Sequence, residues 1–227
     1  MGDEIPPKPV CTGMTRPIPT PIFHITHARH LDSIITNGLR CDRLAQAEGL
    51  AVEIGNRDLK DDRRSVPIRV APGGFVADYA PFYYRAYGPF LSAIDHGRVP
   101  EYTEGIEPLL ILQSTVEHLL EIGCTLVFTD RNALFSTAAH TNRIEDLDAL
   151  VGWDVIHGRY WNDFEDGRER RMAECLVHES VPWEGFLAIA TMTEARATEV
   201  AAMVALATYQ GRTTHQPQVL HKSDWYH

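Results

Sequence analysis

The chain has 227 residues, enough for one large domain or two small ones with a substantial core. Its 21 lysine and arginine residues against 31 aspartate and glutamate residues give a formal net charge of −10, which argues against a protein that coats nucleic acid through bulk charge. The four cysteines are widely spaced without a CxxC pair, and no uncharged apolar run reaches the roughly 18 residues that span a bilayer, so we expect a cytoplasmic protein with reduced thiols and no membrane association.

Residues 1–20 are rich in proline and begin with acidic side chains, which predicts a flexible leader rather than a secretory signal. After it, the stretch PIFHI predicts a short strand in which Phe23 and Ile25 share one face and His24 takes the other. Apolar residues at helical spacing then predict a helix over 31–39.

Residues 41–74 contain glycine, proline and many charges without a clean periodicity. We interpret them as a long excursion, and such excursions in compact domains are often functional. An aromatic-rich block, DYAPFYYRAYGPFLSAI, follows. PLLILQ then predicts a buried strand, STVEHLLEIG a helix that Ser114 and Glu117 cap, and CTLVFTD another strand.

The stretch RIEDLDALVGWDVI predicts a helix and a turn, and residues 157–171 a loop that leads into a strand bearing Glu174. GFLAIATM predicts a further apolar strand, and the alanine-rich helix after it is expected to be capped by Thr191 and Glu194. QVLH predicts a short last strand. Because strands and helices mix without regular βαβ alternation, the pattern predicts one α+β domain over residues 21–227.

Glu174 is the least expected side chain in these strands. Cys175 and Val177 share one face of the predicted strand, and Glu174 lies on the other, where it loses hydration that a partner or a chemical role must offset. A structural interpretation pairs this carboxylate with Arg170 or Arg171 at the start of the strand. The residues by themselves leave both interpretations open.

Several common mechanisms lack their motifs, because GxGxxG after a strand, GxxxxGK[ST], HExxH and GxSxG are all absent. His24 and His27 are three residues apart without a third ligand nearby, which is a weak indication of a metal site. The basic stretches NRDLKDDRRSVPIR and RYWNDFEDGRERR are diluted by acids, so solvated loops of mixed charge explain them as well as a binding surface does.

Five blocks of the sequence carry a family resemblance: IFHITHARHLDSIITNGL, GGFVADYAPFYY, LVFTD, RYWNDFEDGRERRMAECLVHESVPWEG and SDWYH. In this order they resemble the DarT family, the toxin half of a DNA ADP-ribosylating toxin–antitoxin pair. The resemblance runs from about Pro21 to the C-terminus. It implies an α+β, ADP-ribosyltransferase-like fold in which two small sheets with peripheral helices form a cleft for NAD. It also implies transfer of ADP-ribose from NAD to a base, typically thymine, of single-stranded DNA, with release of nicotinamide.

The resemblance assigns Glu174 and Arg63 as catalytic residues, with Arg63 favoured over Arg64. A carboxylate beneath the ribose would stabilise the oxocarbenium character that develops as nicotinamide leaves, and a guanidinium would neutralise pyrophosphate or charge developing on the base. NAD is consumed, and no metal is required. The implied NAD-binding residues are His24, Thr26, His27, Arg63, Tyr79 and Tyr83, and the implied DNA-binding residues are Tyr160, Trp161, Arg168 and Arg170. A macrodomain antitoxin is the implied protein partner.

Two alternatives stay open. One is an ADP-ribosyltransferase that acts on guanine, RNA or protein, including the RNA 2′-phosphotransferase type, whose opening pattern is similar to residues 23–39. The other is a catalytically inactive relative that binds a nucleotide or a partner in a decayed cleft. The presence of both a glutamate and an arginine at the matching positions favours an active enzyme.

Overall fold

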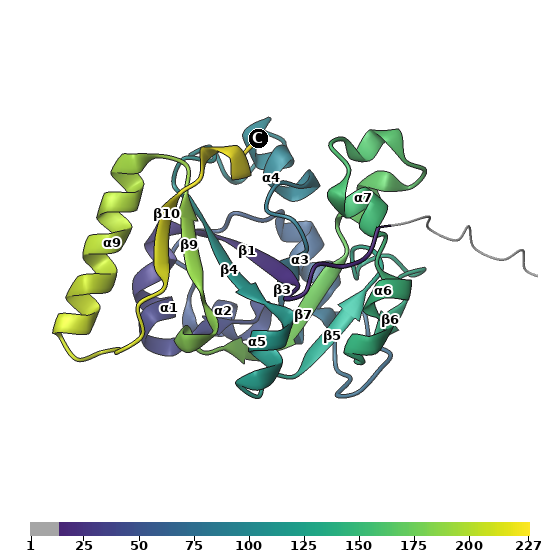
Figure 1. Ribbon diagram of the computed structural model, residues 1–227, viewed down its shortest axis with the longest axis horizontal. Helices are drawn as coiled ribbons and strands as arrows, with labels where there is room; N and C mark the ends of the chain where they lie inside the picture. The colour runs from purple at the N-terminus through teal and green to yellow at the C-terminus, as the bar shows by residue number, and fades with distance from the viewer. Residues whose placement is uncertain (1–13) are drawn as a thin grey trace, which may run out of the picture.

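The computed structural model describes residues 14–227, and its centre is an eight-stranded sheet with the order β10-β9-β4-β1-β3-β7-β5-β6 (Figure 1). A second sheet pairs β2 with β8. All paired strands are antiparallel except β10 and β9, which are parallel. The strands are β1 (Pro21–His27), β2 (Leu39–Arg40), β3 (Tyr79–Tyr83), β4 (Leu109–Thr115), β5 (Leu126–Thr129), β6 (His140–Thr141), β7 (Glu174–His178), β8 (Ser180–Val181), β9 (Ala188–Thr191) and β10 (Gln218–His221).

Helices cover both faces of the large sheet. One core contains buried residues of α1, α5, α7 and α9, and a second core on the other face contains buried residues of α4. This mixture confirms the predicted α+β class. The α-helices of the described chain are α1 (Leu31–Asn37), α2 (Asp42–Glu48), α3 (Arg57–Arg63), α4 (Pro89–Asp95), α5 (Val116–Glu121), α6 (Leu147–Leu150), α7 (Trp153–His157), α8 (Gly167–Arg171) and α9 (Glu194–Tyr209).

Strand β1 shows the alternation that the sequence predicts. Ile22 packs into the core with α1 and α9, whereas Phe23 and Ile25 pack into the core with α4. His24 falls on the Ile22 side, because successive side chains of a strand point to opposite faces. The same rule separates Cys175 from Glu174 in β7.

The large sheet consists of two four-stranded halves that meet between β1 and β3. β1 pairs with β4 along all seven of its residues, but it pairs with β3 through Phe23 and Tyr83. The expected two small sheets are therefore the halves of one larger sheet. His24 lies where the halves separate, and its Nδ1 donates a hydrogen bond of 2.7 Å to the carbonyl oxygen of Pro81 in β3. The imidazole thus satisfies a strand carbonyl at the point where backbone pairing ends.

The caps of two helices differ from the sequence prediction. The hydroxyl of Thr115, not Ser114, accepts a backbone N–H at the start of α5, and the hydroxyl of Thr193, not Thr191, does so at the start of α9. Ser114 and Thr191 are buried within β4 and β9. β4 runs two residues further than the predicted stretch PLLILQ, whereas β9 ends at Thr191 within the predicted GFLAIATM, and in both cases the cap is the extended residue directly before the first helical turn.

Residues 14–20, which the sequence groups with the leader, contact helix α5. Arg16 Nη1 lies 3.1 Å from Glu117 Oε1, and the backbone N–H of Thr20 donates a 2.7 Å hydrogen bond to Glu117 Oε2. Glu117 therefore binds this segment rather than completing a capping box. The rest of the predicted leader, residues 1–13, lies outside the described residues.

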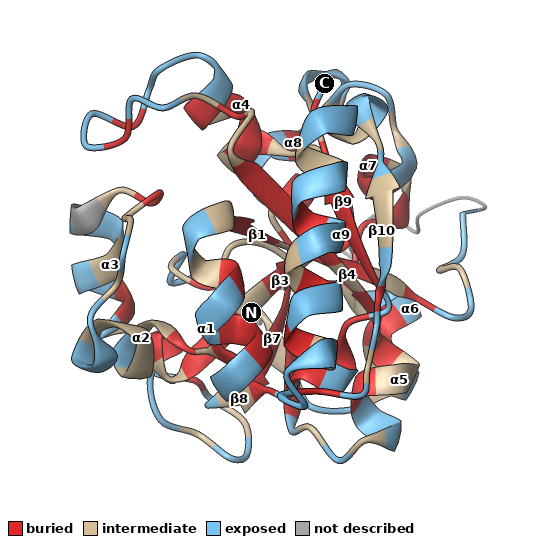
Figure 2. Ribbon diagram, turned by 90° about the vertical axis from the view of Figure 1, so that its left-hand side faces the viewer, coloured by how far each residue is buried: buried red, intermediate tan, exposed pale blue. Residues whose placement is uncertain are grey.

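The excursion predicted over 41–74 contains α2 and α3. Helix α3 begins after Asn56, whose side chain accepts hydrogen bonds from the backbone N–H groups of Asp58 and Leu59. Figure 2 shows α2 and α3 outside the buried strands, with exposed residues on their outer sides. The local capping signal in the sequence therefore marks a helix that the missing apolar periodicity conceals.

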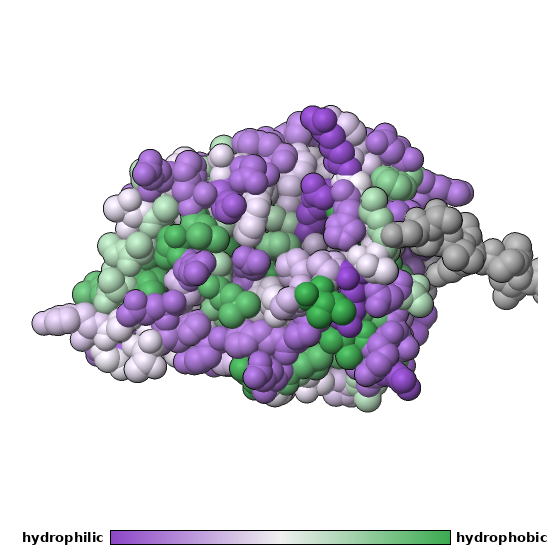
Figure 3. All heavy atoms as spheres, in the orientation of Figure 1, coloured by the Kyte–Doolittle hydropathy of each residue, from purple (hydrophilic) through white to green (hydrophobic). Residues whose placement is uncertain are grey.

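Helix α9 packs through a narrow stripe formed by Val200, Val204 and Ala207. Its outer side exposes Leu206 and Tyr209, and Figure 3 shows apolar residues gathered over this part of the surface among polar ones. Many of the other residues of α9 are alanines, whose small side chains bury little area. The stripe is therefore the part of α9 that holds the helix against the sheet.

Candidate active site

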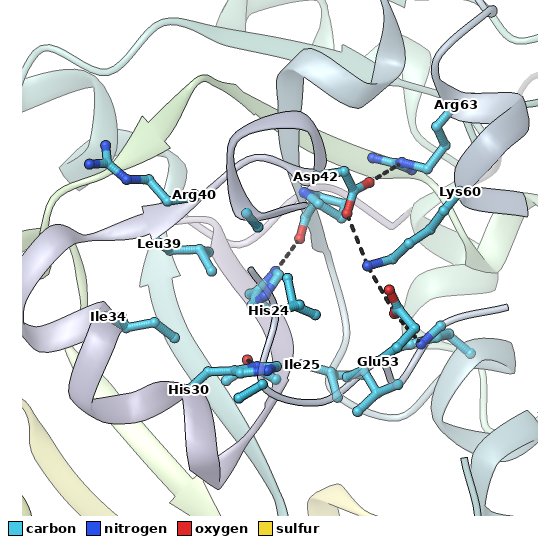
Figure 4. A pocket seen from close by; sticks show the side chains of 18 of the residues that line it. His24, Ile25, His30, Ile34, Leu39, Arg40, Asp42, Glu53, Lys60 and Arg63 are labelled. Carbon is cyan, nitrogen blue, oxygen red and sulfur yellow. Dashed lines mark hydrogen bonds and ion pairs between the residues drawn. The ribbon is translucent and has the colours of Figure 1, made fainter. Parts of the chain in front are cut away.

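A pocket of about 590 Å³ opens where the two halves of the sheet separate (Figure 4). Its walls come from β1 and β3 on the sheet side and from α1, α2 and α3 on the outer side. A pocket of this size is typical of a site for a cofactor or another small molecule. The excursion over 41–74 therefore has a clear structural role, because it closes one side of the pocket.

Glu174 is the first residue of β7, and its side chain is fully buried beside this pocket. Arg63 Nη1 donates to Oε1 of Glu174 at 3.4 Å, and the backbone N–H of Ala133 donates to Oε2 at 2.7 Å. The Glu174 backbone N–H donates in turn to the hydroxyl of Thr129 at 3.0 Å. Burial raises the pKa of Glu174 above its ordinary value, although Arg63 and the Ala133 N–H oppose that rise.

Arg63 ends helix α3 and lines the pocket wall next to Glu174. Its side chain is 8% exposed, and Nε donates a 2.7 Å hydrogen bond to Asp42 Oδ2. Burial lowers the pKa of Arg63, but the carboxylates of Glu174 and Asp42 together raise it above its ordinary value. The guanidinium is therefore a fixed positive charge between two carboxylates.

Arg64 occupies a different environment. Its side chain is 52% exposed and forms an ion pair of 3.1 Å with Asp61 on the outer surface of the chain. One residue corresponds to about 100° of rotation around a helix, so adjacent residues at its end face different directions. The geometry therefore favours Arg63 over Arg64 as the arginine of this site.

The residues that hold Arg63 are not among those that the sequence predicts for the site. Asp42 Oδ1 lies 3.4 Å from Lys60 Nζ, which is also 2.9 Å from Glu53 Oε1 (Figure 4). Burial raises the pKa of Asp42, but Arg63 and Lys60 lower it below the ordinary value. Lys60 and Arg63 share a face of α3 because they are three residues apart. The three-residue spacing of Lys60 and Arg63, after an Asn56 that can cap a helix, is the signal in the sequence that predicts a shared helix face for these two residues.

The β1 residues place His24 and Thr26 at the pocket and His27 away from it. His24 and Thr26 line the wall, and burial lowers the pKa of His24 to about 4, so its imidazole is neutral near pH 7. Thr26 Oγ1 lies 3.0 Å from Nδ1 of His30, another residue of the wall. His27 points to the opposite face of β1, where its Nε2 lies 3.6 Å from Glu104. Strand alternation therefore separates the two histidines and does not support His27 as an NAD-binding residue.

The two predicted NAD-binding tyrosines of β3 lie in different places, one at the pocket and one in a core. Tyr83 lines the pocket and is paired in register with Glu174. Tyr79 lies at the other end of β3, where it packs into a core with Val76 and Leu176. Its hydroxyl donates a 2.6 Å hydrogen bond to the Gly73 carbonyl. Tyr79 is thus a core residue of the structure rather than part of the pocket wall.

The segment before Glu174 contains the predicted DNA-binding residues. Tyr160 is 55% exposed, Arg168 is exposed, and the Trp161 ring centroid lies 5.9 Å from that of Tyr87. Arg170 forms a 2.8 Å ion pair with Asp154 of α7. These side chains lie together near the surface, and helix α8 replaces the last part of the predicted loop.

The structural interpretation of Glu174 as a partner of Arg170 or Arg171 is wrong. Arg170 pairs with Asp154, and Arg171 donates to backbone carbonyl groups. A small cavity lined by Arg171 lies next to the main pocket, with which it shares Tyr83 and Met172. Arg171 and Met172, which follow the predicted DNA-binding residues in the chain, line this small cavity, whereas Tyr160, Trp161, Arg168 and Arg170 line neither cavity.

Two further properties concern the described part of the chain. Residues 14–227 contain no group of three or more histidine, cysteine, aspartate or glutamate side chains arranged to hold a metal ion. None of the helices in this range combines the length and the apolar character needed to traverse a bilayer.

The DarT family model, described as ssDNA thymidine ADP-ribosyltransferase, matches residues 23–227. A DNA ADP-ribosyl transferase of Thermus sp. (strain 2.9) is 34% identical over 214 residues, which cover 94% of this chain and 99% of that protein. The solved structure of Thermus sp. 2.9 DarT in complex with ADP-ribosylated ssDNA matches with a TM-score of 0.86 at 32% identity, over 94% of this chain and 99% of the other. The complex of Thermus sp. 2.9 DarT with NAD+ matches with a TM-score of 0.82 at 33% identity, over 94% and 100% of the two chains. The resemblance seen in the sequence is confirmed, and this chain belongs to the DarT family of single-stranded-DNA thymidine ADP-ribosyltransferases.

Proposed function

We propose that this protein transfers ADP-ribose from NAD to thymidine in single-stranded DNA and releases nicotinamide, with Glu174 and Arg63 as its catalytic residues. The observation that carries the proposal is the buried contact between these two side chains at the wall of a pocket of about 590 Å³. Family membership supports the reaction, and the related DarT of Thermus sp. 2.9 forms complexes with NAD+ and with ADP-ribosylated ssDNA.

Glu174 stabilises the charge that develops on the ribose. When the bond between the ribose carbon and the nicotinamide nitrogen breaks, that carbon gains oxocarbenium character, and a nearby carboxylate offsets the positive charge. A thymine ring nitrogen then forms the new bond to the same carbon. The proton that this nitrogen loses passes to the Glu174 carboxylate, which its raised pKa makes a better proton acceptor than an ordinary glutamate.

Arg63 supports the negative charges of the reaction. Its planar guanidinium offers several donors in a fixed geometry, which suits a pyrophosphate or a thymine oxygen on which charge develops. Asp42 holds one edge of the guanidinium through Nε, and this leaves Nη1 directed at Glu174. The arginine is therefore oriented before substrate binds, which lowers the cost of ordering it in the transition state.

His24 offers a neutral acceptor to NAD. Its Nδ1 donates to the Pro81 carbonyl, so Nε2 of the neutral ring carries a lone pair. A ribose hydroxyl or the nicotinamide amide of NAD can donate to that nitrogen. Thr26 and Tyr83 contribute to the same wall of the pocket.

The DNA strand binds along the segment that contains Tyr160, Trp161 and Arg168. The aromatic rings provide stacking surface, worth on the order of 1–3 kcal/mol for each base that stacks. Arg168 is exposed and supplies a positive charge for a phosphate. Contacts to a few nucleotides reconcile DNA modification with the net charge of −10.

A toxin of this kind acts on cellular DNA, which agrees with the cytoplasmic location expected from the sequence. The family resemblance also supports a macrodomain antitoxin as a partner that removes the modification. Co-expression with such a macrodomain protein should restore growth to cells in which this protein is toxic.

The test of the proposed function uses labelled NAD with oligonucleotides of identical sequence, one single-stranded and one annealed to its complement, at one salt concentration. The single strand should be labelled and the duplex should be largely inert. In the duplex the thymine ring nitrogen is paired, and extrusion of the base costs a few kcal/mol. Parallel reactions with RNA and with protein test the alternative acceptors.

The outcomes separate the candidates. Labelling of single-stranded DNA at thymidine supports the proposal, and a matched oligonucleotide without thymine serves as the control. Exclusive labelling of RNA or protein contradicts it, and release of a 2′-phosphate from RNA identifies the phosphotransferase alternative. Replacement of Trp161 by alanine should weaken DNA labelling more than NAD binding, because Trp161 belongs to the segment proposed to bind DNA and does not line the pocket of about 590 Å³.

A further inference from the structure

Arg171 is a buried cation whose partners differ from those of the other buried arginine at this site. Only 2% of the residue is exposed, and Nη1 donates to the carbonyl oxygen of Ile156 at 3.1 Å and to that of Gly158 at 2.9 Å. The Val155 carbonyl accepts a third hydrogen bond from the same nitrogen. Arg63, by contrast, is held by two carboxylates.

The three carbonyl groups belong to the C-terminal end of α7 and to the residue that follows it. Carbonyl groups at a helix end lack partners within the helix, so a cationic side chain that binds several of them satisfies polar groups that would otherwise be left unpaired. Arg85 donates to two neighbouring carbonyls, those of Ile156 and His157. Two arginines therefore fix the point at which the chain leaves α7.

Burial of the positive charge of Arg171 has an energetic cost. Burial, with a further contribution from the nearby Arg85, lowers the pKa of Arg171 to about 10. The side chain stays protonated near pH 7, and dipoles of backbone carbonyls rather than a carboxylate compensate it. A methionine of similar length would avoid this cost but would leave the carbonyls unpaired.

Arg171 also contacts the predicted DNA-binding segment directly. Its guanidinium carbon lies 5.7 Å from the centroid of the Trp161 ring, within the range of a cation–π contact. The Trp161 ring in turn lies 5.9 Å from Tyr87. Three residues after Arg171 the chain reaches Glu174, so one side chain connects the aromatic segment to the strand with the catalytic carboxylate.

The segment between α7 and α8 is packed tightly, so that a displacement of one part of it displaces the rest. A Cβ atom on Gly167 would lie 1.8 Å from the Trp161 carbonyl oxygen, and one on Gly158 would lie 2.7 Å from the Phe164 ring. Neither distance is compatible with a larger side chain unless the segment moves. A shift at its α7 end is therefore transmitted to Trp161.

We propose that Arg171 is a positioning residue for DNA. It ties residues 158–167 to the end of α7 and thereby sets the position of the Trp161 ring relative to Glu174. Arg171 therefore determines the affinity for the single-stranded DNA acceptor and not the affinity for NAD. This inference rests on the proposed function. Arg171 acts through Trp161 and through the backbone carbonyls. Lysine at this position can bind carbonyls but cannot stack a planar group on the indole, so it should restore part of the effect.

The experiment compares wild type with Arg171→Met, Arg171→Lys and Arg212→Met. The last is a charge-matched control, because Arg212 follows α9 on the opposite side of the molecule from α7 (Figure 1). With a thymine-containing oligonucleotide and labelled NAD, Arg171→Met should raise KM for the oligonucleotide by about tenfold, equivalent to about 1.4 kcal/mol. KM for NAD should stay within about twofold of wild type, Arg171→Lys should be intermediate, and Arg212→Met should match wild type.

A parallel rise of both KM values, or an unchanged KM for the oligonucleotide, would overturn the proposal. If Arg171→Met does not fold, Arg171→Lys is measured in the wild-type and Trp161→Ala backgrounds. The effect of the lysine should then disappear once Trp161 is absent, and an undiminished effect would also overturn the proposal.

A second measurement is independent of catalysis. Trypsin should cleave after Arg159 and Arg168 faster in Arg171→Met than in Arg212→Met, because the tie to α7 is lost. An unchanged cleavage rate contradicts the tie. A wild-type protein that leaves DNA unlabelled contradicts the proposed function instead, so the two failures are distinguishable.

Discussion

Arg63 and Glu174 are 111 positions apart in the chain, and the guanidinium of one lies 3.4 Å from the carboxylate of the other. Helix α3 brings the arginine, β7 brings the glutamate, and the pocket between the sheet halves lies beside both. In the mechanism proposed above, the pair brings two opposite charges to one point: the carboxylate supports a positive ribose and the guanidinium supports negative oxygen atoms.

Replacement of Glu174 by glutamine should lower the rate of DNA modification by about 10²- to 10³-fold, because the oxocarbenium-like transition state loses its counter-charge while the shape of the side chain is kept. The measurement is labelling of a single-stranded oligonucleotide with saturating NAD. Glu121→Gln is the control, since Glu121 is an exposed residue of α5. A Glu174→Gln variant as fast as wild type would make the residue structural.

The two adjacent arginines should respond differently to the same change. Arg63→Lys should lower kcat by about 10- to 100-fold, since a hydrogen bond to a charged group contributes roughly 1.5–3 kcal/mol and lysine lacks the fork of donors. Arg64→Lys should leave kcat unchanged, because Arg64 is half exposed and pairs with Asp61. Equal losses in both variants would contradict the assignment of Arg63.

Asp42→Asn should lower kcat by about tenfold through the orientation of Arg63. The 2.7 Å contact from Nε to Oδ2 loses its charge, which corresponds to about 1.5 kcal/mol for one charged hydrogen bond. Asp58→Asn, at an exposed position of α3, is the matched control. In the Arg63→Lys background the Asp42→Asn effect should shrink, and full additivity of the two losses would show that Asp42 acts independently of Arg63.

The pH dependence of the rate should report Glu174. The carboxylate acts in its charged form, and burial raises its pKa, so the rate should fall on the acid side at a pH above the ordinary glutamate value. The residual rate of Glu174→Gln should lack this acid limb. A wild-type limb at or below the ordinary value would contradict the role of the buried carboxylate.

His24 should make the folded protein sensitive to acid. Burial lowers the pKa of His24 from 6.5 to about 4, so below pH 6.5 the unfolded chain binds a proton that the folded chain does not. The free energy of unfolding should therefore decrease as the pH falls from 6.5 towards 4. His24→Asn keeps an N–H for the Pro81 carbonyl and should reduce this slope in urea denaturation. His221→Asn, at an exposed position of β10, is the control variant.

The sequence by itself determined six of the strands, the α+β class and the family, whereas the aromatic-rich block gave no prediction of β3. The alternation in PIFHI and the apolar stretches PLLILQ and GFLAIATM correspond to β1, β4 and β9, because side-chain periodicity is a local property of each strand. The position of Glu174 on the face opposite Cys175 followed from the same rule. The five family blocks indicate a DNA ADP-ribosyltransferase, because together they match one family.

Only the tertiary structure decided what these residues touch. β1 and β3 pair at Phe23 and Tyr83 and separate beyond that point, which opens the pocket. The position of that separation depends on how two strands that are distant in the sequence approach each other. Asp42 and Lys60 became part of the site because α2 and α3 fold back onto it from a stretch without apolar periodicity. The free energy lost when a carboxylate leaves water shows that buried Glu174 needs a partner. It does not identify that partner, because the energy of an ion pair depends on distance in space and not on separation along the chain.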